Sequence, residues 1–222
     1  PGNKLWVNSS LPHLQRSLEA ARQLLKAAGF SWNVSGSLMD ANHQPVEFSI
    51  VVASSNSQRM QMATIIQDDL SKLGMKVNVV PLEFRALLAS VFQNYNYEAA
   101  ILGLGGGDAD PNAEMNVWVS NGSTHLWHLG ETRPATTWEA ELDRLMNQQM
   151  LTLNYHRRKR LYDQVQQIIA SNLPMVFLAT PDVLVAAKPG VGNFHPAVLE
   201  PTTLWNVDQL YLSQGAEMAR SH

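Results

Sequence analysis

The chain has 222 residues, of which 45% are hydrophobic and 16% are charged, and its formal net charge is -3. This length suits one large domain or two small ones, and the composition excludes a disordered chain because a sizeable core can be buried. The lack of cysteine excludes disulfides and thiolate chemistry, and the absence of a strongly basic face argues against nucleic acid as a partner.

Strands alternate with amphipathic helices through the first half of the sequence. Apolar residues spaced four and three apart over positions 14–28 predict a helix, which Gly29 ends. The polar stretch 30–45 predicts a loop or a short hairpin. Two βαβ units then predict a parallel sheet with right-handed crossovers. Their expected elements are strand 46–53, helix 58–73, strand 75–82, helix 84–95 and strand 97–104.

The second half is mostly helical and then irregular. After a long polar and aromatic loop at 121–138, two amphipathic helices are expected at 139–153 and 157–172. The apolar run 175–179 predicts a further buried strand, and 183–187 is a candidate for another. A last short extended segment is expected at 204–212.

One stretch joins a buried strand to a flexible, acidic end. The apolar run 97–104 leads into three glycines and then into Asp108 and Asp110. The carboxyl ends of parallel strands meet at one edge of a sheet, where ligands bind in open α/β folds. We therefore expect Asp108 and Asp110 at a ligand-binding edge, with the serine-rich run 54–57 nearby. An ordinary strand end followed by a turn is the simpler alternative.

Two kinds of chemistry compete at this acidic run. A nucleotide loop is excluded, because Asp108 stands where Gly103-x-Gly105 would need its third glycine, and no Gly-Lys-Ser or Gly-Lys-Thr occurs. Asp108, Asp110 and Glu114 can flank a glycosidic bond, which makes a hydrolase the alternative function. A carboxylate can instead hold a ligand's ammonium group, and Asp110 before a proline can simply cap a helix.

Histidines and tryptophans of the loop 121–138 are the remaining candidates. His125 and His128 have a spacing that binds metal on a helix, but a glycine-bounded loop does not fix that geometry. The sequence therefore predicts no metal, no cofactor and, since no nucleophile has a base beside it, no catalytic turnover. Trp118, Trp127 and Trp138 can stack on a ligand, and we retain Trp127 as the candidate.

Seven short motifs occur in a distinctive order along the chain. They are Ala21-Arg-Gln-Leu-Leu-Lys-Ala-Ala-Gly29-Phe30, Pro45-Val-Glu-Phe, Gln67-Asp-Asp-Leu-Ser-Lys-Leu-Gly74-Met-Lys-Val77, Gly107-Asp108-Ala-Asp110-Pro111, Asp143-Arg-Leu-Met, Arg158-Lys-Arg-Leu-Tyr162-Asp-Gln-Val-Gln166 and Asn172-Leu-Pro174-Met-Val-Phe. Each motif alone is weak, but their order and spacing are specific. From about Leu14 to about Leu212, the chain resembles the C-terminal lobe of the family 5 extracellular solute-binding proteins, the dipeptide, oligopeptide and nickel receptors of bacterial ABC importers.

The resemblance implies an α/β fold, a three-layer periplasmic-binding-protein-like lobe of type II. With the two short crossovers, it implies the order 2-1-3 for the first three strands. It implies that residues 1–222 form a single lobe of a longer two-lobed receptor, and that 204–212 crosses back toward the missing N-terminal lobe. The start at Pro1, without Met or signal peptide, agrees with that expectation.

The resemblance also implies a ligand site. In peptide-binding members an aspartate of the Gly-Asp-x-Asp-Pro region holds the peptide's α-ammonium, and Asp108 matches it when a one-residue gap is allowed. Two positions differ from the peptide carriers, because Gly105 replaces a usual tryptophan and Leu102 an arginine that some carriers have. These differences indicate a roomier, less polar site, open to a cationic or neutral solute as well as a peptide.

The sequence thus predicts a solute-binding lobe that closes on a peptide, or on another small cationic or polar solute, against the N-terminal lobe of the same chain. Its further partners are the membrane subunits of an ABC importer. The resemblance implies a periplasmic or extracellular location, with a membrane tether in the missing N-terminus as one arrangement. The expected ligand-binding residues are Ser55, Gly106, Gly107, Asp108, Asp110 and Trp127.

Overall fold

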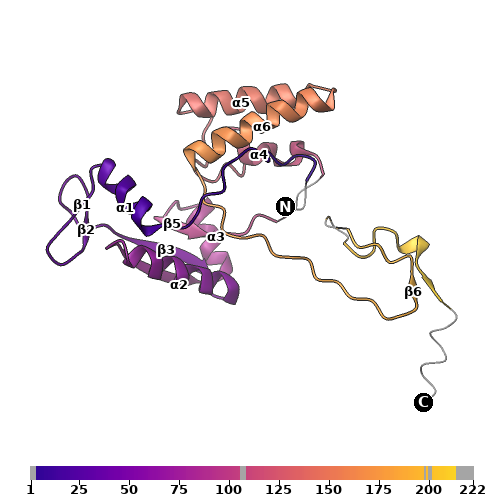
Figure 1. Cartoon of the computed structure of the whole chain (residues 1–222), viewed down its shortest axis with the longest axis horizontal. Helices are drawn as coiled ribbons and strands as arrows, with labels where there is room; N and C mark the ends of the chain where they lie inside the picture. The colour runs from indigo at the N-terminus through magenta and orange to yellow at the C-terminus, as the bar shows by residue number, and fades with distance from the viewer. Residues whose placement is uncertain (1–3, 106–108, 198, 200–201, 214–222) are drawn as a thin grey trace, which may run out of the picture. The chain divides into compact units, whose positions relative to one another are not determined.

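The computed structural model of the chain describes residues 4–105, 109–197, 199 and 202–213, and Figure 1 shows its course. The chain divides into two compact units. We call His13–Leu104 the sheet unit, and Pro1–Pro12 together with Gly105–His222 the helical unit. Among the described helices, none combines the length and the apolar character needed to cross a bilayer.

A three-stranded parallel sheet lies at the centre of the sheet unit. Its strands are β3 (Glu47–Ala53), β4 (Lys76–Leu82) and β5 (Ala99–Ile101). The middle strand is β3, in which Val51 pairs with Val80 on one side and with Ala100 on the other. The observed order β4–β3–β5 is the 2-1-3 order expected from the sequence. The third strand is shorter than the expected 97–104, because β5 pairs only with residues 50–52 of β3.

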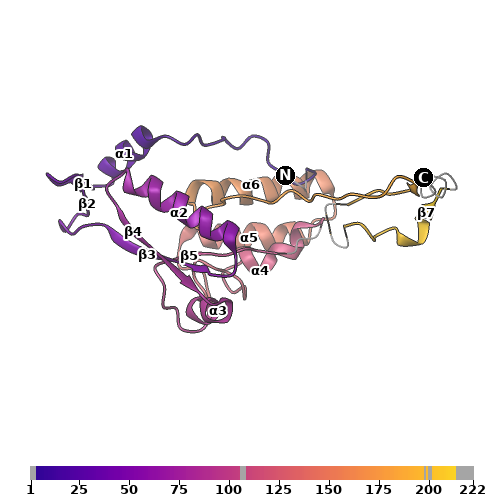
Figure 2. The ribbon, with the colours of Figure 1, turned by 90° about the horizontal axis from the view of Figure 1, so that it is seen from below.

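Helices cover both faces of this sheet. Helix α2 (Ser57–Ser71) packs Ala63 against Ile50 and Val52 of β3 in one buried cluster. Successive strand residues face opposite sides, so the buried Val51 faces the other side, where α3 (Phe84–Phe92) lies. Figure 2 shows α2 and α3 on opposite sides of the sheet. The expected helix–sheet–helix arrangement is therefore present.

A small hairpin precedes the sheet, as the sequence predicted. Its strands are β1 (Ser31–Trp32) and β2 (Leu38–Met39), which pair antiparallel after helix α1 (Leu18–Ala27). The carbonyl of Gly74, just after α2, accepts a hydrogen bond of 2.8 Å from the Leu38 amide. Gly74 has a φ of +87°, and a Cβ there would lie 2.3 Å from the Gly36 carbonyl oxygen. Only glycine meets both conditions, so Gly74 allows the hairpin to pack against the end of α2.

Two long helices, α5 and α6, form the core of the helical unit and lie side by side. Reciprocal hydrogen bonds between Thr136 and Glu139 cap the start of α5. The facing apolar side chains are Leu142, Leu145 and Met146 of α5 with Leu161, Val165 and Ile169 of α6. The helical elements of this unit are η1 (Pro111–Glu114), α4 (Met115–Trp118), α5 (Thr137–Met150), α6 (Tyr155–Asn172) and η2 (Val207–Gln209).

The two strands expected after α6 are absent, and this prediction was wrong. Residues 175–179 and 183–187 run without strand pairing, and Val176, Phe177 and Leu184 are 74%, 65% and 91% exposed. An apolar run becomes a strand only when another strand hydrogen-bonds to it, and no described residue does so here. The expected segment 204–212 contains η2 and then β7 (Tyr211–Leu212), which pairs with β6 (Val191–Gly192).

Candidate functional site

The three parallel strands bring their carboxyl ends to one edge of the sheet unit. Beyond β3, Ser55 is exposed in the turn that leads into α2, so its hydroxyl is accessible from solvent. The next residue, Asn56, caps α2 by accepting a hydrogen bond of 2.9 Å from the Arg59 amide. The serine-rich run therefore acts locally as a helix start, and it leaves Ser55 at the edge where the sequence placed it.

Arg59 is a residue of this edge that the sequence reasoning missed. Its guanidinium lies against Gly103, two residues beyond β5, where a Cβ would come within 2.0 Å of Nη2. Any side chain at position 103 would displace this group, so the glycine makes room for the cation. Within the described residues, Arg59 forms no ion pair. The signal in the sequence was a glycine within the apolar run 97–104, because a glycine in a strand pattern often marks the close approach of another group.

Of the two expected acidic anchors, Asp110 lies within the described residues and Asp108 does not. Gly106, Gly107 and Asp108 lie outside the described residues. Asp110 is described, and Arg158 of α6 donates to both of its oxygens, from Nη1 to Oδ2 at 2.6 Å and from Nη2 to Oδ1 at 2.5 Å. Asp110 also caps η1 by accepting a hydrogen bond of 2.9 Å from the Asn112 amide.

Asp110 thus has a clear structural role. The Arg158 guanidinium and the Asn112 amide hold the pKa of Asp110 below its usual range, although partial burial acts the other way. Arg158 is itself fixed by a hydrogen bond from Nε to Gln149 of 2.8 Å and lies over the Trp6 ring, 5.1 Å from the ring centroid. The helix cap that the sequence allowed for Asp110, as an alternative to ligand binding, is therefore present.

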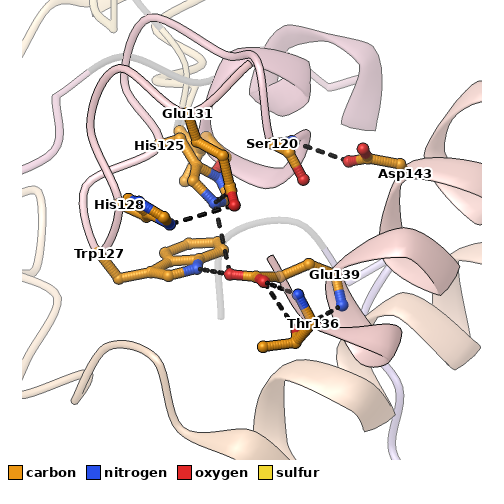
Figure 3. A network of polar contacts seen from close by, with 9 residues as sticks. Ser120, His125, Trp127, His128, Glu131, Thr136, Glu139 and Asp143 are labelled. Carbon is orange, nitrogen blue, oxygen red and sulfur yellow. Dashed lines mark hydrogen bonds and ion pairs between the residues drawn. The ribbon is translucent and has the colours of Figure 1, made fainter. Parts of the chain in front are cut away.

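Trp127 lies in a cluster of aromatic and titratable side chains of the helical unit (Figure 3). Its ring is tilted against that of His125, with 3.8 Å between centroids, and lies between Trp118 and Trp138. Its Nε1 donates a hydrogen bond of 3.0 Å to Oε1 of Glu139. The half-buried Trp127 therefore packs against the core of this unit. Within the described residues, no hydrogen bond or ring contact joins it to Asp110.

The polar part of this cluster was not found from the sequence. His125 is fully buried, and the side chains of Glu131 and Glu139 are 3% and 4% exposed. Burial opposes ionisation of Glu139, but hydrogen bonds from Thr136 and Trp127, with the nearby His125, outweigh it and hold its pKa below the usual range. The two glutamates lie six and fourteen positions after His125, a spacing that matches no local motif.

Comparison with known families gives a match over more than half of the chain. The model described as "Bacterial extracellular solute-binding proteins, family 5 Middle" matches residues 1–125. A "Probable ABC transporter-binding protein" of Deinococcus radiodurans is 27% identical over 195 residues, which cover 82% of this chain and 33% of that protein. The "Oligopeptide-binding protein AppA" of Bacillus subtilis is 21% identical over 92% of this chain and 36% of its own length.

Solved structures show the same fold. The structure of AppA from Bacillus subtilis in complex with a nonapeptide aligns with a TM-score of 0.69, covering 93% of this chain and 40% of that one. The periplasmic binding protein MelB from Agrobacterium fabrum, in complex with stachyose, aligns with a TM-score of 0.67 at 16% identity, covering 77% of this chain and 27% of that one. The chain spans about a third of the length of the curated relatives it matches.

Proposed function

This chain belongs to family 5 of the bacterial extracellular solute-binding proteins, and from this membership we propose that it is a ligand-binding lobe of an ABC importer receptor. The observation that carries the proposal is the β4–β3–β5 sheet, whose carboxyl edge leads into the glycine-rich, acidic run after β5. Ligands of open α/β folds bind at such an edge. The proposed partners are a small solute or peptide and the membrane subunits of the importer.

The chain as a whole is proposed to be the C-terminal lobe of a two-lobed receptor. The exposed apolar segment 175–187 supports this, because exposure of side chains such as Phe177 and Leu184 to water is unfavourable and a covering partner would remove it. We propose that this segment and 204–212 contact the N-terminal lobe, and that 204–212 crosses back toward it. Hydrogen exchange tests this arrangement, since the amides of 175–187 should be protected in the two-lobed protein and unprotected in the 222-residue chain.

The proposed ligand is a peptide or another small cationic or polar solute. Asp108 is the proposed anchor for an ammonium group, with Gly106, Gly107 and Ser55 beside it, because a carboxylate binds an ammonium by charge-assisted hydrogen bonds. Arg59 supplies a cation at the same edge, which can pair with a ligand carboxylate in place of the arginine that Leu102 replaces. Asp110 and Trp127 remain proposed contacts, although both have structural partners.

Proteins of this fold bind ligands of different classes. One solved structure of this fold contains a nonapeptide and another contains stachyose. The family and the relatives named above are binding proteins, and the absence of catalytic turnover is our proposal for this chain. A location in the periplasm or outside the cell follows the family, and a membrane tether upstream of this chain is part of the proposal.

The test is made on the protein that includes both lobes. Calorimetric titration against pooled peptides, amines and oligosaccharides should give saturable binding of one class, while chromogenic glycosides and peptides are not cleaved. Cleavage that disappears in Asp108→Asn would favour the hydrolase instead. A gene that encodes no second lobe upstream of this chain would contradict the two-lobed receptor.

A further inference from the structure

The contact of His125 with a backbone carbonyl determines which ring nitrogen carries the hydrogen. Nδ1 lies 3.1 Å from the carbonyl oxygen of Val117. A carbonyl can only accept, so Nδ1 carries the hydrogen and Nε2 is left with a free lone pair when the ring is neutral. Nε2 is buried and has no hydrogen-bond partner among the described residues. The burial of Nε2 is compensated when its lone pair faces a cation, or when Nε2 carries a proton that it shares with an anion.

Two carboxylates face this nitrogen. Oε2 of Glu131 lies 3.4 Å from His125 Nε2, and Oε1 of Glu139 lies 3.9 Å from it. One ligand atom from each of the three side chains lies within 4.8 Å of the other two. Both oxygens of Glu131 lack a well-aligned hydrogen bond from the described residues, although His128 Nδ1 approaches Oε1 to 3.1 Å. Figure 3 shows these side chains converging on one point.

Several polar atoms of the cluster lack a partner among the described residues. His125 Nε2 and both carboxylate oxygens of Glu131 are buried without a well-aligned hydrogen bond, which is unfavourable for polar groups. The His128 side chain, which is 52% exposed, reaches Glu131 from the solvent side. A divalent ion neutralises both carboxylates and at the same time gives the Nε2 lone pair a partner.

The geometry fits a small divalent metal. Ligand atoms around tetrahedral zinc, at bonds of about 2.0–2.1 Å, lie about 3.3 Å from one another, close to the His125–Glu131 separation. Metal-bound histidines donate their other N–H to a carbonyl, as His125 does to Val117. Glu139 is oriented in the same way by Thr136 and Trp127. An imidazole ligand disfavours magnesium and calcium, which prefer oxygen ligands.

We propose that His125 Nε2, Glu131 and Glu139 bind a zinc ion in the interior of the helical unit. Water takes the fourth position, and His128 supports Glu131 from outside. The ion ties the long loop before α5 to the first turn of that helix, because His125 and Glu131 come from the loop and Glu139 from α5. This site departs from the expectation of no metal, which rested on the spacing of the candidate ligands along the sequence.

The test uses the 222-residue chain without a histidine tag, stripped of metal with a chelator. Zinc titration followed by elemental analysis should give one zinc per chain for the wild type. Glu131→Gln should weaken zinc binding at least a hundredfold and remove the rise in melting temperature that zinc causes. His156→Gln, on the exposed start of α6, is the matched control and should bind zinc as the wild type does.

Cobalt provides a measurement that does not depend on any variant. Cobalt(II) bound to the wild type should give the strong visible absorption of a four-coordinate site, and one equivalent of zinc should abolish it. Weak absorption of a six-coordinate ion would overturn the proposal. So would zinc binding by the wild type that is no tighter than that of Glu131→Gln, which would leave the cluster as a network of hydrogen-bonded acids and histidines.

Discussion

Arg158 donates two hydrogen bonds to Asp110, and this ion pair joins α6 to the 3-10 helix η1 that follows the glycine-rich run. The two residues are 48 positions apart. The pair holds the first described turn after that run in place. Within the helical unit, the pair therefore fixes the start of η1 against α6.

Removal of this ion pair should destabilise the helical unit. Arg158→Ala loses both hydrogen bonds to Asp110, the one to Gln149 and the contact with Trp6. Because the Asp110 side chain is 43% exposed, solvent screening limits the expected loss to about 1–2 kcal/mol of unfolding free energy. Urea unfolding measures it. Arg157→Ala, the exposed neighbour, is the control and should change the free energy by less than about 0.5 kcal/mol.

The contribution of Asp110 should depend on pH in a defined direction. Arg158 lowers the pKa of Asp110 in the folded state, so the charged carboxylate stabilises the fold above the pKa of the unfolded chain, about 3.9. This contribution is lost as the pH falls through the folded pKa. The difference in unfolding free energy between the wild type and Asp110→Asn should therefore be full at pH 7 and shrink below about pH 4. A difference that grows on acidification would contradict the assignment.

Asp108 should dominate the affinity of the two-lobed protein for a cationic ligand. If Asp108 meets an ammonium in a closed, dry cleft, Asp108→Ala should cost about 2–5 kcal/mol of binding free energy, as for a buried pair that loses one partner. Asp110→Ala is the comparison. The isolated chain should show almost none of the effect, because its ligand stays hydrated and screened. Calorimetry that gives equal affinities for the wild type and Asp108→Ala would remove Asp108 from the site.

Arg59 should matter for ligands with a carboxylate and not for the fold. Arg59→Ala removes a guanidinium that has no ion pair within the described part of the chain, so the unfolding free energy should stay within about 0.5 kcal/mol. The binding free energy for an unblocked peptide should weaken by the contribution of one charge-assisted hydrogen bond, about 1.5–3 kcal/mol. The affinity for the C-terminally amidated peptide should stay the same. Equal losses for both peptides would show that Arg59 does not contact the carboxylate.

Two glycines at helix ends allow conformational strain to be separated from crowding. Gly74→Ala combines a φ of +87° with a Cβ 2.3 Å from a backbone oxygen, so we expect a loss of about 2–4 kcal/mol. Gly29→Ala has a φ of +91° but open space around its Cβ, and should cost only about 1–2 kcal/mol. Thermal unfolding of both variants measures the difference. Equal losses would mean that the hairpin moves away from Gly74 without cost.

Local patterns in the sequence determined most of the secondary structure. Alternating and 3.6-residue periodicities are properties of neighbouring residues, so β3, β4, α2, α3, α5 and α6 could be predicted within a few residues of their ends. The order of the strands followed from two short crossovers and the family resemblance. The carboxyl edge of the sheet followed from the same reasoning, and Ser55 lies at it. The ligand-binding roles of Ser55 and of Asp108, which lies outside the described residues, stay predictions.

The tertiary structure alone decided which residues meet across the sequence. Arg59 lies against Gly103, Arg158 pairs with Asp110, and Glu131 and Glu139 converge on His125, although no pattern marks these partners. The run 175–179 was wrongly expected to be a strand, because its apolar residues satisfy the local pattern while no strand of the described chain pairs with it. Periodicity reports only on local conformation. Hydrogen-bond partners, ion pairs and ligand sets depend on which distant segments packing brings together.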